Sequence, residues 1–345
     1  MSSPATTRIP FWDNAKFAAI ALVIVGHAIV PLKAGSDIAE AFYYLVNAFH
    51  MPAFALVSGY FSRAEQTGRH RIRVFTDLVV PYVIFEAIAR VLTVLLTDAP
   101  LTKLTASTWA TWFLIALAIW RIVLPYLAML RFPLVFAVLI SLGVGFLPDV
   151  NTTFALRRTL GFLPFFILGW WLKERGYVQR FSLDVRRPAW VRGAAGAILL
   201  GTGVLLWWQL DWLNAHHFNQ WIWFNSYNNT MAHEAWWGAL VRLGVIAAAV
   251  LLAACFFALL PTREVAWTRL GEYTMYAYLL HIVVVYPIRL LEAEGVIVYP
   301  EDPIWIWLPV ICALCVALTF ALTSRPVRWA TRWLVEPRVD WLFRR

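Results

Sequence analysis

FWDNAKFAAIALVIVGH, the stretch from Phe11 to His27, decides the fold of this protein. Its charged residues, Asp13 and Lys16, lie in the first turns, and an uninterrupted apolar run leads from there to His27. With the apolar residues that follow, the segment covers about 11–32, close to the roughly 20 residues that a helix needs to cross a bilayer. No small-residue cleavage site follows it, so we expect it to stay in the protein as a transmembrane helix.

The composition of the whole chain agrees with this prediction. Of its 345 residues, 61% are hydrophobic and only 14% are charged, whereas a soluble domain is about half apolar and about one quarter charged. These values exclude a soluble globular enzyme, a disordered chain and a secreted disulfide scaffold. Ten apolar segments follow one another at roughly 11–32, 42–62, 75–97, 108–130, 132–148, 158–173, 190–210, 238–260, 270–290 and 304–323. We therefore predict an all-α polytopic membrane protein, a bundle of about ten transmembrane helices around a polar central cavity.

The charges between these segments predict the orientation in the membrane. Loops and termini on one side hold 20 lysine and arginine residues, and the alternate loops hold 5. Because cytoplasmic loops are enriched in these residues, both termini are expected in the cytoplasm. The net charge of +9 then reflects contact with anionic membrane lipid, and no nucleic-acid motif is present. We expect a transmembrane domain over 8–325 and a basic amphipathic cytoplasmic tail over 326–345, which either anchors to the membrane surface or binds a partner.

Four ionisable residues are predicted at a similar depth in the outer half of the bundle: His27, His50, Arg242 and His281. An ionisable group at membrane depth costs at least about 2.5 to 3.5 kcal/mol, so each one is a candidate functional residue. Four such residues at one depth predict a shared polar cavity.

The inner end of the first segment carries a second candidate site. Asp13 and Lys16 are three residues apart, so they share a helix face and can pair. Lys16 precedes His27 by eleven residues, which is about three turns and roughly 16 to 17 Å along a helix. A cation at one end and an imidazole at the other suit a long, thin ligand with an anionic head, such as the pantetheine arm of acyl-coenzyme A. The alternative is that Lys16 only anchors the inner end of the helix.

Three further features have two interpretations each. Glu86 and Arg90 are four residues apart and either pair within their helix or contact a substrate. The outer loop 207–237 holds seven tryptophans and five asparagines, which suit either sugar rings or an interfacial aromatic belt. The three cysteines lie in apolar segments, where helix packing is favoured over a redox or metal role, and we expect no metal site.

Phe11 to His27 also resembles the first helix of the integral-membrane acyltransferase family 3, in particular its branch of fucose 4-O-acetylase-like acetyltransferases. Further blocks occur in the order of that family: FHMPAFALVSGYF (Phe49 to Phe61), VVPYVIF (Val79 to Phe85), TWFLIAL (Thr111 to Leu117), LPFFILGWWL (Leu163 to Leu172) and LGEYTMYAYLLH (Leu270 to His281). Each block is weak alone, but the ordered set covers nearly the whole chain and is fairly specific.

The resemblance implies transfer of an acyl group, usually acetyl, from cytoplasmic acyl-coenzyme A to a hydroxyl of an extracytoplasmic or lipid-linked sugar, by a multi-pass protein of the inner (plasma) membrane. The first-helix histidine of the family, its catalytic base, matches His27. His50 matches the histidine of the second-helix block, and Asp13 matches an acidic residue. Lys16 stands where the wider family often has arginine, which resembles the fucose-acetylase-like branch.

The chemistry requires the same residue types. A histidine, whose pKa is ordinarily near 6.5, can take the proton of a sugar hydroxyl as it attacks the thioester. We therefore assign catalytic roles to His27, His50 and Asp13, and the oxyanion needs donors such as His50, Arg242 or Trp112. The phosphates of acetyl-coenzyme A, the co-substrate, are assigned to Lys16, Arg69, Arg71 and Arg73. The glycan or glycolipid acceptor is assigned to Arg242, His281, Trp112 and Arg158.

Two other interpretations remain open from the sequence. A transporter or flippase of a sugar-linked lipid would use the same polar cavity without acyl chemistry, although no internal repeat supports this class. Alternatively, the fold is the same but the donor is succinyl-coenzyme A, which Arg157, Arg158 and Arg242 leave possible. An acyl-imidazole intermediate on His27 is a further option within the acyltransferase hypothesis.

Overall fold

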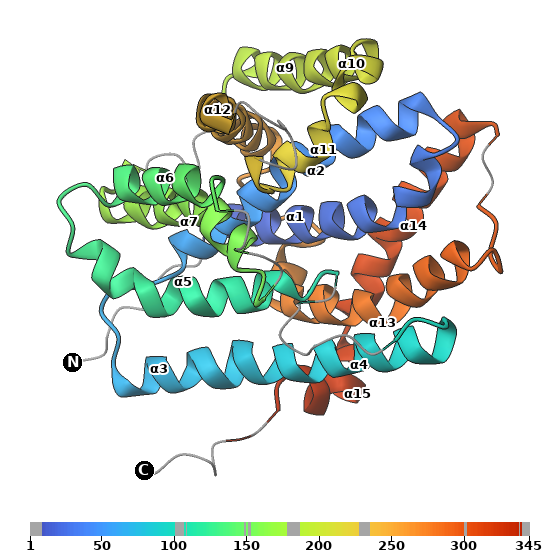
Figure 1. The fold of residues 1–345 in the computed structure, drawn as a ribbon. Coiled ribbons are helices and arrows are strands. Elements are labelled where there is room, and N and C mark those ends of the chain that lie inside the picture. Colours follow the sequence, from blue (N-terminus) through green and yellow to red (C-terminus); the bar gives the residue numbers. More distant parts are fainter. Residues whose placement is uncertain are drawn as a thin grey trace.

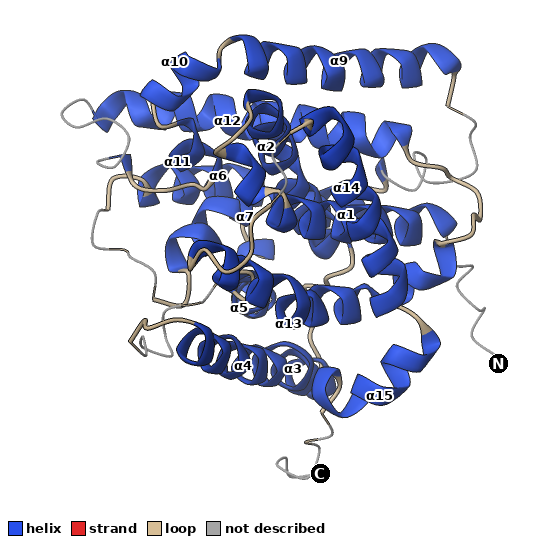
Figure 2. Ribbon diagram, turned by 90° about the vertical axis from the view of Figure 1, so that its right-hand side faces the viewer, coloured by secondary structure: helices blue, strands red, loops and turns tan. Residues whose placement is uncertain are grey.

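The computed structural model describes residues 9–100, 107, 109–147, 150, 153–177, 187–227, 235–299, 302–337 and 339. Within these residues the fold is all-helical and contains no strand (Figure 2). The predicted helical class is therefore confirmed for the part of the chain that the structure describes.

The helices follow the predicted apolar segments closely. In chain order they are α1 (Pro10–Ala28), η1 (Val30–Lys33), α2 (Asp37–Tyr60), α3 (Gly68–Val74), η2 (Phe75–Val79), α4 (Val80–Leu96), α5 (Trp112–Ala128), α6 (Pro133–Val144), α7 (Leu156–Glu174), α9 (Ala189–Trp208), α10 (Leu210–Ala215), α11 (Phe218–Ile222), α12 (Ala235–Leu259), η4 (Thr268–Tyr273), α13 (Thr274–Ala293), α14 (Ile304–Leu322) and α15 (Arg325–Val335). Each of the ten predicted segments overlaps one of α1, α2, α4, α5, α6, α7, α9, α12, α13 and α14.

Within the described residues, six helical stretches are long and apolar enough to cross a membrane. They are Asp37–Tyr60, His70–Leu96, Ala189–Trp208, Trp236–Leu259, Thr268–Ala293 and Ile304–Leu322. The helices α5 and α6 are apolar but shorter. The structure thus supports several membrane spans among the described residues, while ten spans and the side on which the termini lie stay predictions.

The helix α1 lies in the middle of the bundle and contacts α2, α13, α14 and η4 (Figure 1). Most of its residues are buried, because an apolar helix without a polar face is stable only when it is surrounded. By contrast, α9 lies at the edge of the bundle (Figure 1) and buries only Ala195 and Leu206 within the protein. This exposed apolar surface is typical of a helix that faces lipid.

Two glycines set the distance between α2 and α7. A Cβ atom at Gly59 would overlap the carbonyl oxygen of Phe166, and one at Gly169 would overlap the carbonyl oxygen of Leu56. Small residues at such a crossing let two backbones approach closely, which is the usual way that helices pack in a membrane. The close contact places α2 against the first helix on one side and α7 on the other.

Asn14 fixes the beginning of α1. Its side-chain nitrogen donates to the carbonyl oxygens of Pro261 (2.9 Å) and Arg263 (3.0 Å), and its side-chain oxygen accepts from the hydroxyl of Thr268 (2.7 Å). The side chain is fully buried. The amide therefore ties the first turns of α1 to the link between α12 and η4.

We expect the substitution Asn14→Ala to lower the free energy of unfolding by roughly 1–3 kcal/mol, because it removes the partner of two partly buried carbonyls and the acceptor of the buried Thr268 hydroxyl. The measurement is the unfolding midpoint of the purified protein in detergent. Asn219→Ala is the matched control, since Asn219 is only half-buried and lies on the short helix α11. Equal midpoints for the two variants would contradict this role of Asn14.

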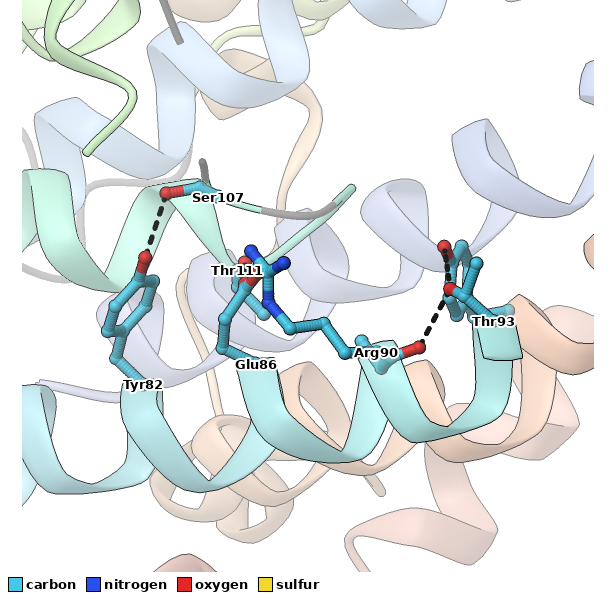
Figure 3. A network of polar contacts seen from close by, with 8 residues as sticks. Tyr82, Glu86, Arg90, Thr93, Ser107 and Thr111 are labelled. Atoms are coloured by element: carbon cyan, nitrogen blue, oxygen red, sulfur yellow. Dashed lines mark hydrogen bonds and ion pairs between the residues drawn. The ribbon is translucent and has the colours of Figure 1, made fainter. Parts of the chain in front are cut away.

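Glu86 and Arg90 form a buried ion pair on α4, with 2.7 Å between Glu86 Oε1 and Arg90 Nη2. The hydroxyl of Thr111, just before α5, donates to Glu86 Oε2, and the three side chains point toward one another in Figure 3. The hydroxyls of Tyr82 and Ser107 lie 3.2 Å apart in the same network. The pairing predicted from the spacing is thus present. Neither charged residue lines any of the three cavities described below, which favours a structural role.

The tail begins as the predicted helix. The helix α15 packs on α4, α13 and α14, and the guanidinium of Arg328 lies 3.3 Å from the centre of the Tyr273 ring. Trp329 and Trp333 remain exposed. The predicted apolar residues Trp341, Leu342 and Phe343 lie outside the described residues.

Candidate active site

Residues of the first helix line three cavities in the described structure. One cavity lies at the His27 end of the helix, and two lie at the end of Asp13 and Lys16. One cavity of about 410 Å³ contains His27, and it is called the histidine cavity below. A second, of about 660 Å³, contains Lys16 and is called the lysine cavity. A third, of about 910 Å³, lies between η4, α13 and α15 and contains Asp13.

The histidine cavity is formed by α1, η1, α2, the turn before α5, the start of α7, the segment after α11 and the far part of α13. Its polar and charged lining residues are His27, Lys33, Tyr43, Asn47, His50, Ser107, Arg157, Arg158, Asn225 and Arg289. Trp109, Trp112 and Trp223 supply aromatic walls. A small cavity with apolar walls and a few convergent polar groups has the composition of a ligand site.

His50 is buried and held in one orientation by α2. Its Nδ1 atom lies 2.8 Å from the carbonyl oxygen of Val46. A carbonyl can only accept, so Nδ1 carries the proton and donates it, which leaves Nε2 of the neutral ring with a free lone pair. The ring packs close to α1, since a Cβ built at Gly26 would lie 4.0 Å from His50 Nε2, an ordinary van der Waals distance.

His27 lies against two rings. The centres of the His27 and Trp109 rings are 4.1 Å apart, and the His27 and His281 rings stack at 5.5 Å with an angle of 25°. His281 is fully buried behind His27, and its Nδ1 atom donates to the carbonyl of Ala277 at 3.2 Å. His281 therefore does not line the cavity but supports the His27 ring from behind.

Trp112 and Arg158 line the same cavity as His27 and His50. The guanidinium of Arg158 lies 5.7 Å from the Trp112 ring and 6.0 Å from the Trp223 ring. The structure thus brings together four of the predicted site residues, with His281 directly behind them.

Arg242 is not part of this group. Its Nη1 atom donates to the carbonyl of Ser141 (2.9 Å), its Nη2 atom donates to the carbonyl of Asn225, and its guanidinium lies 4.5 Å from the Tyr227 ring. The side chain is fully buried and does not line the cavity. A similar depth in the bundle therefore did not place Arg242 on the same face as the histidines, and its contacts tie α12 to α6 instead.

The lysine cavity lies at the opposite end of α1. Its basic lining residues are Lys16, Arg73, Arg121 and Arg332. Of the predicted phosphate-binding residues, Lys16 and Arg73 are present, whereas Arg71 does not line the cavity. The side chain of Arg69 lies outside what the structure describes.

Asp13 pairs with Lys16 across 2.8 Å, as the spacing predicts. It lines the third cavity, and it precedes His27 by 14 residues, or about 21 Å along the helix. Asp13 is therefore separated from the histidines, and this position supports orientation of Lys16 rather than direct contact with reacting groups.

An aromatic layer separates the histidine cavity from the lysine cavity. Phe54 and Phe113 meet edge to face at 5.0 Å, Phe54 and Tyr278 stack at 6.3 Å, and all three residues line the lysine cavity. One turn along α2 from Phe54, His50 and Met51 line the histidine cavity. A single face of α2 thus passes both cavities, which lie end to end.

Several lining residues were not recognised as site residues in the sequence. Lys33 and Arg289 were counted only as loop charges, and Arg121 only as an interruption of an apolar segment. Lys33 follows His27 by six residues and Arg289 follows His281 by eight. This short distance in sequence from the two histidines is the feature that could have marked both residues as site candidates. Lys33 is half-buried with its Nζ atom 4.6 Å from the Tyr43 ring, and burial lowers its pKa from the ordinary value.

The tryptophan-rich loop supplies one aromatic wall of the histidine cavity. Among its described tryptophans only Trp223 lines the histidine cavity. Trp207, Trp208, Trp212, Trp236 and Trp237 are exposed, and Trp221 packs against Tyr227 at 5.9 Å. Most of these rings therefore suit an interfacial belt, and one suits a ligand wall.

The model of the acyltransferase 3 family, described as an acyltransferase domain, matches residues 9–324. The chain belongs to this family. Membership implies acyltransferase activity, and together with the apolar helices it indicates a multi-pass membrane protein. Comparison with curated proteins and with solved structures gave no match. Among the described residues no group of three histidine, cysteine or acidic side chains could hold a metal ion.

Proposed function

We propose that this member of the acyltransferase 3 family is an O-acyltransferase of the plasma membrane. It moves an acetyl group from cytoplasmic acyl-coenzyme A to a hydroxyl of a cell-envelope glycan or glycolipid. The observation that carries the proposal is the end-to-end arrangement of the lysine cavity and the histidine cavity along one face of α2, the first lined by four basic residues together with Asp77 and Glu336. Lys16 in place of arginine supports the branch of fucose 4-O-acetylase-like enzymes.

The donor is assigned to the lysine cavity. The excess of basic residues in the loops at this end supports a cytoplasmic location, where acyl-coenzyme A is present. Lys16, Arg73 and Arg121 offer cations for the coenzyme phosphates. The roughly 16 to 17 Å between the levels of Lys16 and His27 suits the extended pantetheine arm, which would pass the aromatic layer of Phe54, Phe113 and Tyr278.

The acceptor hydroxyl is assigned to the histidine cavity, with His27 as the general base. The hydroxyl oxygen attacks the thioester carbon while His27 takes its proton, the C–S bond breaks, and the proton passes to the leaving thiolate. The Nε2 lone pair of His50 can accept a hydrogen bond from a sugar hydroxyl, so His50 suits orientation of the acceptor better than the oxyanion role that the sequence suggested. Of the three oxyanion donors suggested by the sequence, His50, Arg242 and Trp112, only the indole N–H of Trp112 keeps that role.

The first test uses purified protein in nanodiscs with radiolabelled acetyl-coenzyme A, with and without a lipid-glycan extract of the cell envelope. We expect free coenzyme A to appear and label to enter the extract. Label on the protein in the absence of extract would indicate an acyl-imidazole intermediate. A parallel reaction with succinyl-coenzyme A compares the donors.

Absence of coenzyme binding and of coenzyme release, with extract present, would contradict the proposal. That result would favour the transport of a sugar-linked lipid through the same cavity.

A further inference from the structure

The histidine cavity carries an excess of positive charge. Four cationic side chains line it, and among the described residues no aspartate or glutamate does. The four are Lys33, Arg157, Arg158 and Arg289. Cations collected in a partly enclosed site attract anions strongly, because low-dielectric walls focus their field.

Nearby carboxylates offset this charge only in part. Glu292 Oε2 lies 4.0 Å from Arg289 Nε, at the limit of an ion pair, while Arg289 Nη1 is buried without a hydrogen-bond partner among the described residues. Glu40 lies close enough to Lys33 to act on its charge. No carboxylate of the described chain pairs with Arg158, which is held between the Trp112 and Trp223 rings. Arg158 and Arg289 therefore keep donors for a ligand.

The cations lie farther from the Lys16 end than the histidines do. Lys33 is six residues beyond His27, in η1 after the end of α1, and Arg289 is eight residues beyond His281 on α13, about 12 Å along the helix axis. The helix α7 begins at the same side, where Ala155 lines the cavity, and the N-terminal end of a helix favours negative charge. The positive region thus lies on the far side of the histidines from the lysine cavity.

The position of these cations indicates which of the two substrates, donor or acceptor, would carry a negative charge in this cavity. An acyl group that arrives from the lysine cavity reaches the aromatic layer and His27 first, so a carboxylate on a dicarboxylic donor would lie short of Lys33 and Arg289. A charge on the acceptor, by contrast, would lie among them while the acceptor hydroxyl reached His27. The placement of the cations therefore favours a charged acceptor over a charged acyl group.

We propose that the acceptor is an anionic glycoside. Resting on the proposed function, this assigns a carboxylate or phosphate to Arg158, Arg289 and Lys33, in the same cavity as the His27 ring that faces the acceptor hydroxyl. The planar guanidinium groups match the paired oxygens of either anion, and the Trp112 and Trp223 rings hold the Arg158 guanidinium in position.

The test measures binding in nanodiscs without acyl-coenzyme A, by the ligand-dependent shift of the unfolding temperature. The probes are methyl glucoside, methyl glucuronide and glucose 1-phosphate. We expect both anionic probes to bind at least about tenfold more tightly than the neutral one, and added salt to reduce the difference. The better of the two anionic probes distinguishes an acidic sugar from a phosphate-linked carrier.

Four variants complete the design. Arg158→Gln and Arg289→Gln should each weaken binding of the preferred anion by roughly tenfold to hundredfold and leave the neutral probe unchanged. Arg289→Lys keeps the charge and should retain most of the preference. Arg131→Gln, which removes an exposed arginine between α5 and α6, is the matched control and should behave as the wild type.

Equal affinity for neutral and anionic probes, absence of binding by both anions, or indifference to both glutamine variants would each overturn the proposal. Because the assay needs no donor, these results are independent of turnover. Preference for anions without acyl transfer would contradict the proposed function alone, and acyl transfer without the preference would contradict only the anionic acceptor.

Discussion

Replacing His27 by alanine should lower the rate of acyl transfer by at least about a hundredfold, because the acceptor hydroxyl loses the group that removes its proton. The ring lines the cavity and rests on Trp109 and His281, so its loss leaves the helix contacts of α1 in place. The measurement is the release of free coenzyme A from labelled acetyl-coenzyme A in the presence of the envelope extract. Binding of acetyl-coenzyme A, measured separately, should be almost unchanged.

The control is His216→Ala. His216 is exposed, stacks on Trp212 at 4.2 Å and does not line the histidine cavity. The His216→Ala variant should transfer acyl groups at the wild-type rate. Turnover of His27→Ala within a few-fold of this control would exclude His27 as the general base.

Replacing Lys16 by glutamine should raise the KM for acyl-coenzyme A by roughly tenfold to hundredfold and change kcat little, because a cation that contacts the phosphates contributes about equally to the ground state and the transition state. Lys16 is three-quarters buried beside Asp13 and over the Phe61 ring, so its ammonium is only partly screened by water. Initial rates at varied acyl-coenzyme A concentration separate the two constants.

Two variants isolate this effect from the loss of the ion pair. The double variant Asp13→Asn with Lys16→Gln removes both partners, and we expect the same high KM with a stability closer to that of the wild type. Lys173→Gln is the matched control, since Lys173 donates to the carbonyl of Ser62 at the same end of the bundle and lines none of the three cavities. An unchanged KM in the double variant would move the phosphate site away from Lys16.

The sequence was most informative where the contacts are local. The pairs Asp13–Lys16 and Glu86–Arg90 follow from spacings of three and four residues on a helix, and both are present. The positions of the helices follow from the lengths of the apolar segments. These features need no knowledge of how the helices are arranged.

Contacts between distant segments were not predictable in the same way. Arg242 is held by the carbonyl of Ser141, which is 101 residues away, and a depth estimate cannot show on which side of a helix such a partner lies. Lys33 and Arg289 have the charge of ordinary loop residues, and only the packing of η1 and α13 brings them to the wall of one cavity. The candidate acceptor site therefore became visible only in three dimensions.

The walls of the two cavities differ in origin. The lysine cavity is lined largely by helical residues of α2, η2, α5, α13 and α15, whereas Ser107, Trp109, Trp223 and Asn225 of the histidine cavity lie in connections between helices. Connections tolerate sequence change far better than packed helices do. If the histidine cavity takes the acceptor as proposed, substitutions in these connections should change its contacts with the acceptor more readily than substitutions in the packed helices. Grafting only these connections from a related enzyme should change the walls around the glycan, whereas the preference for an anion should stay with Lys33 of η1, Arg158 of α7 and Arg289 of α13.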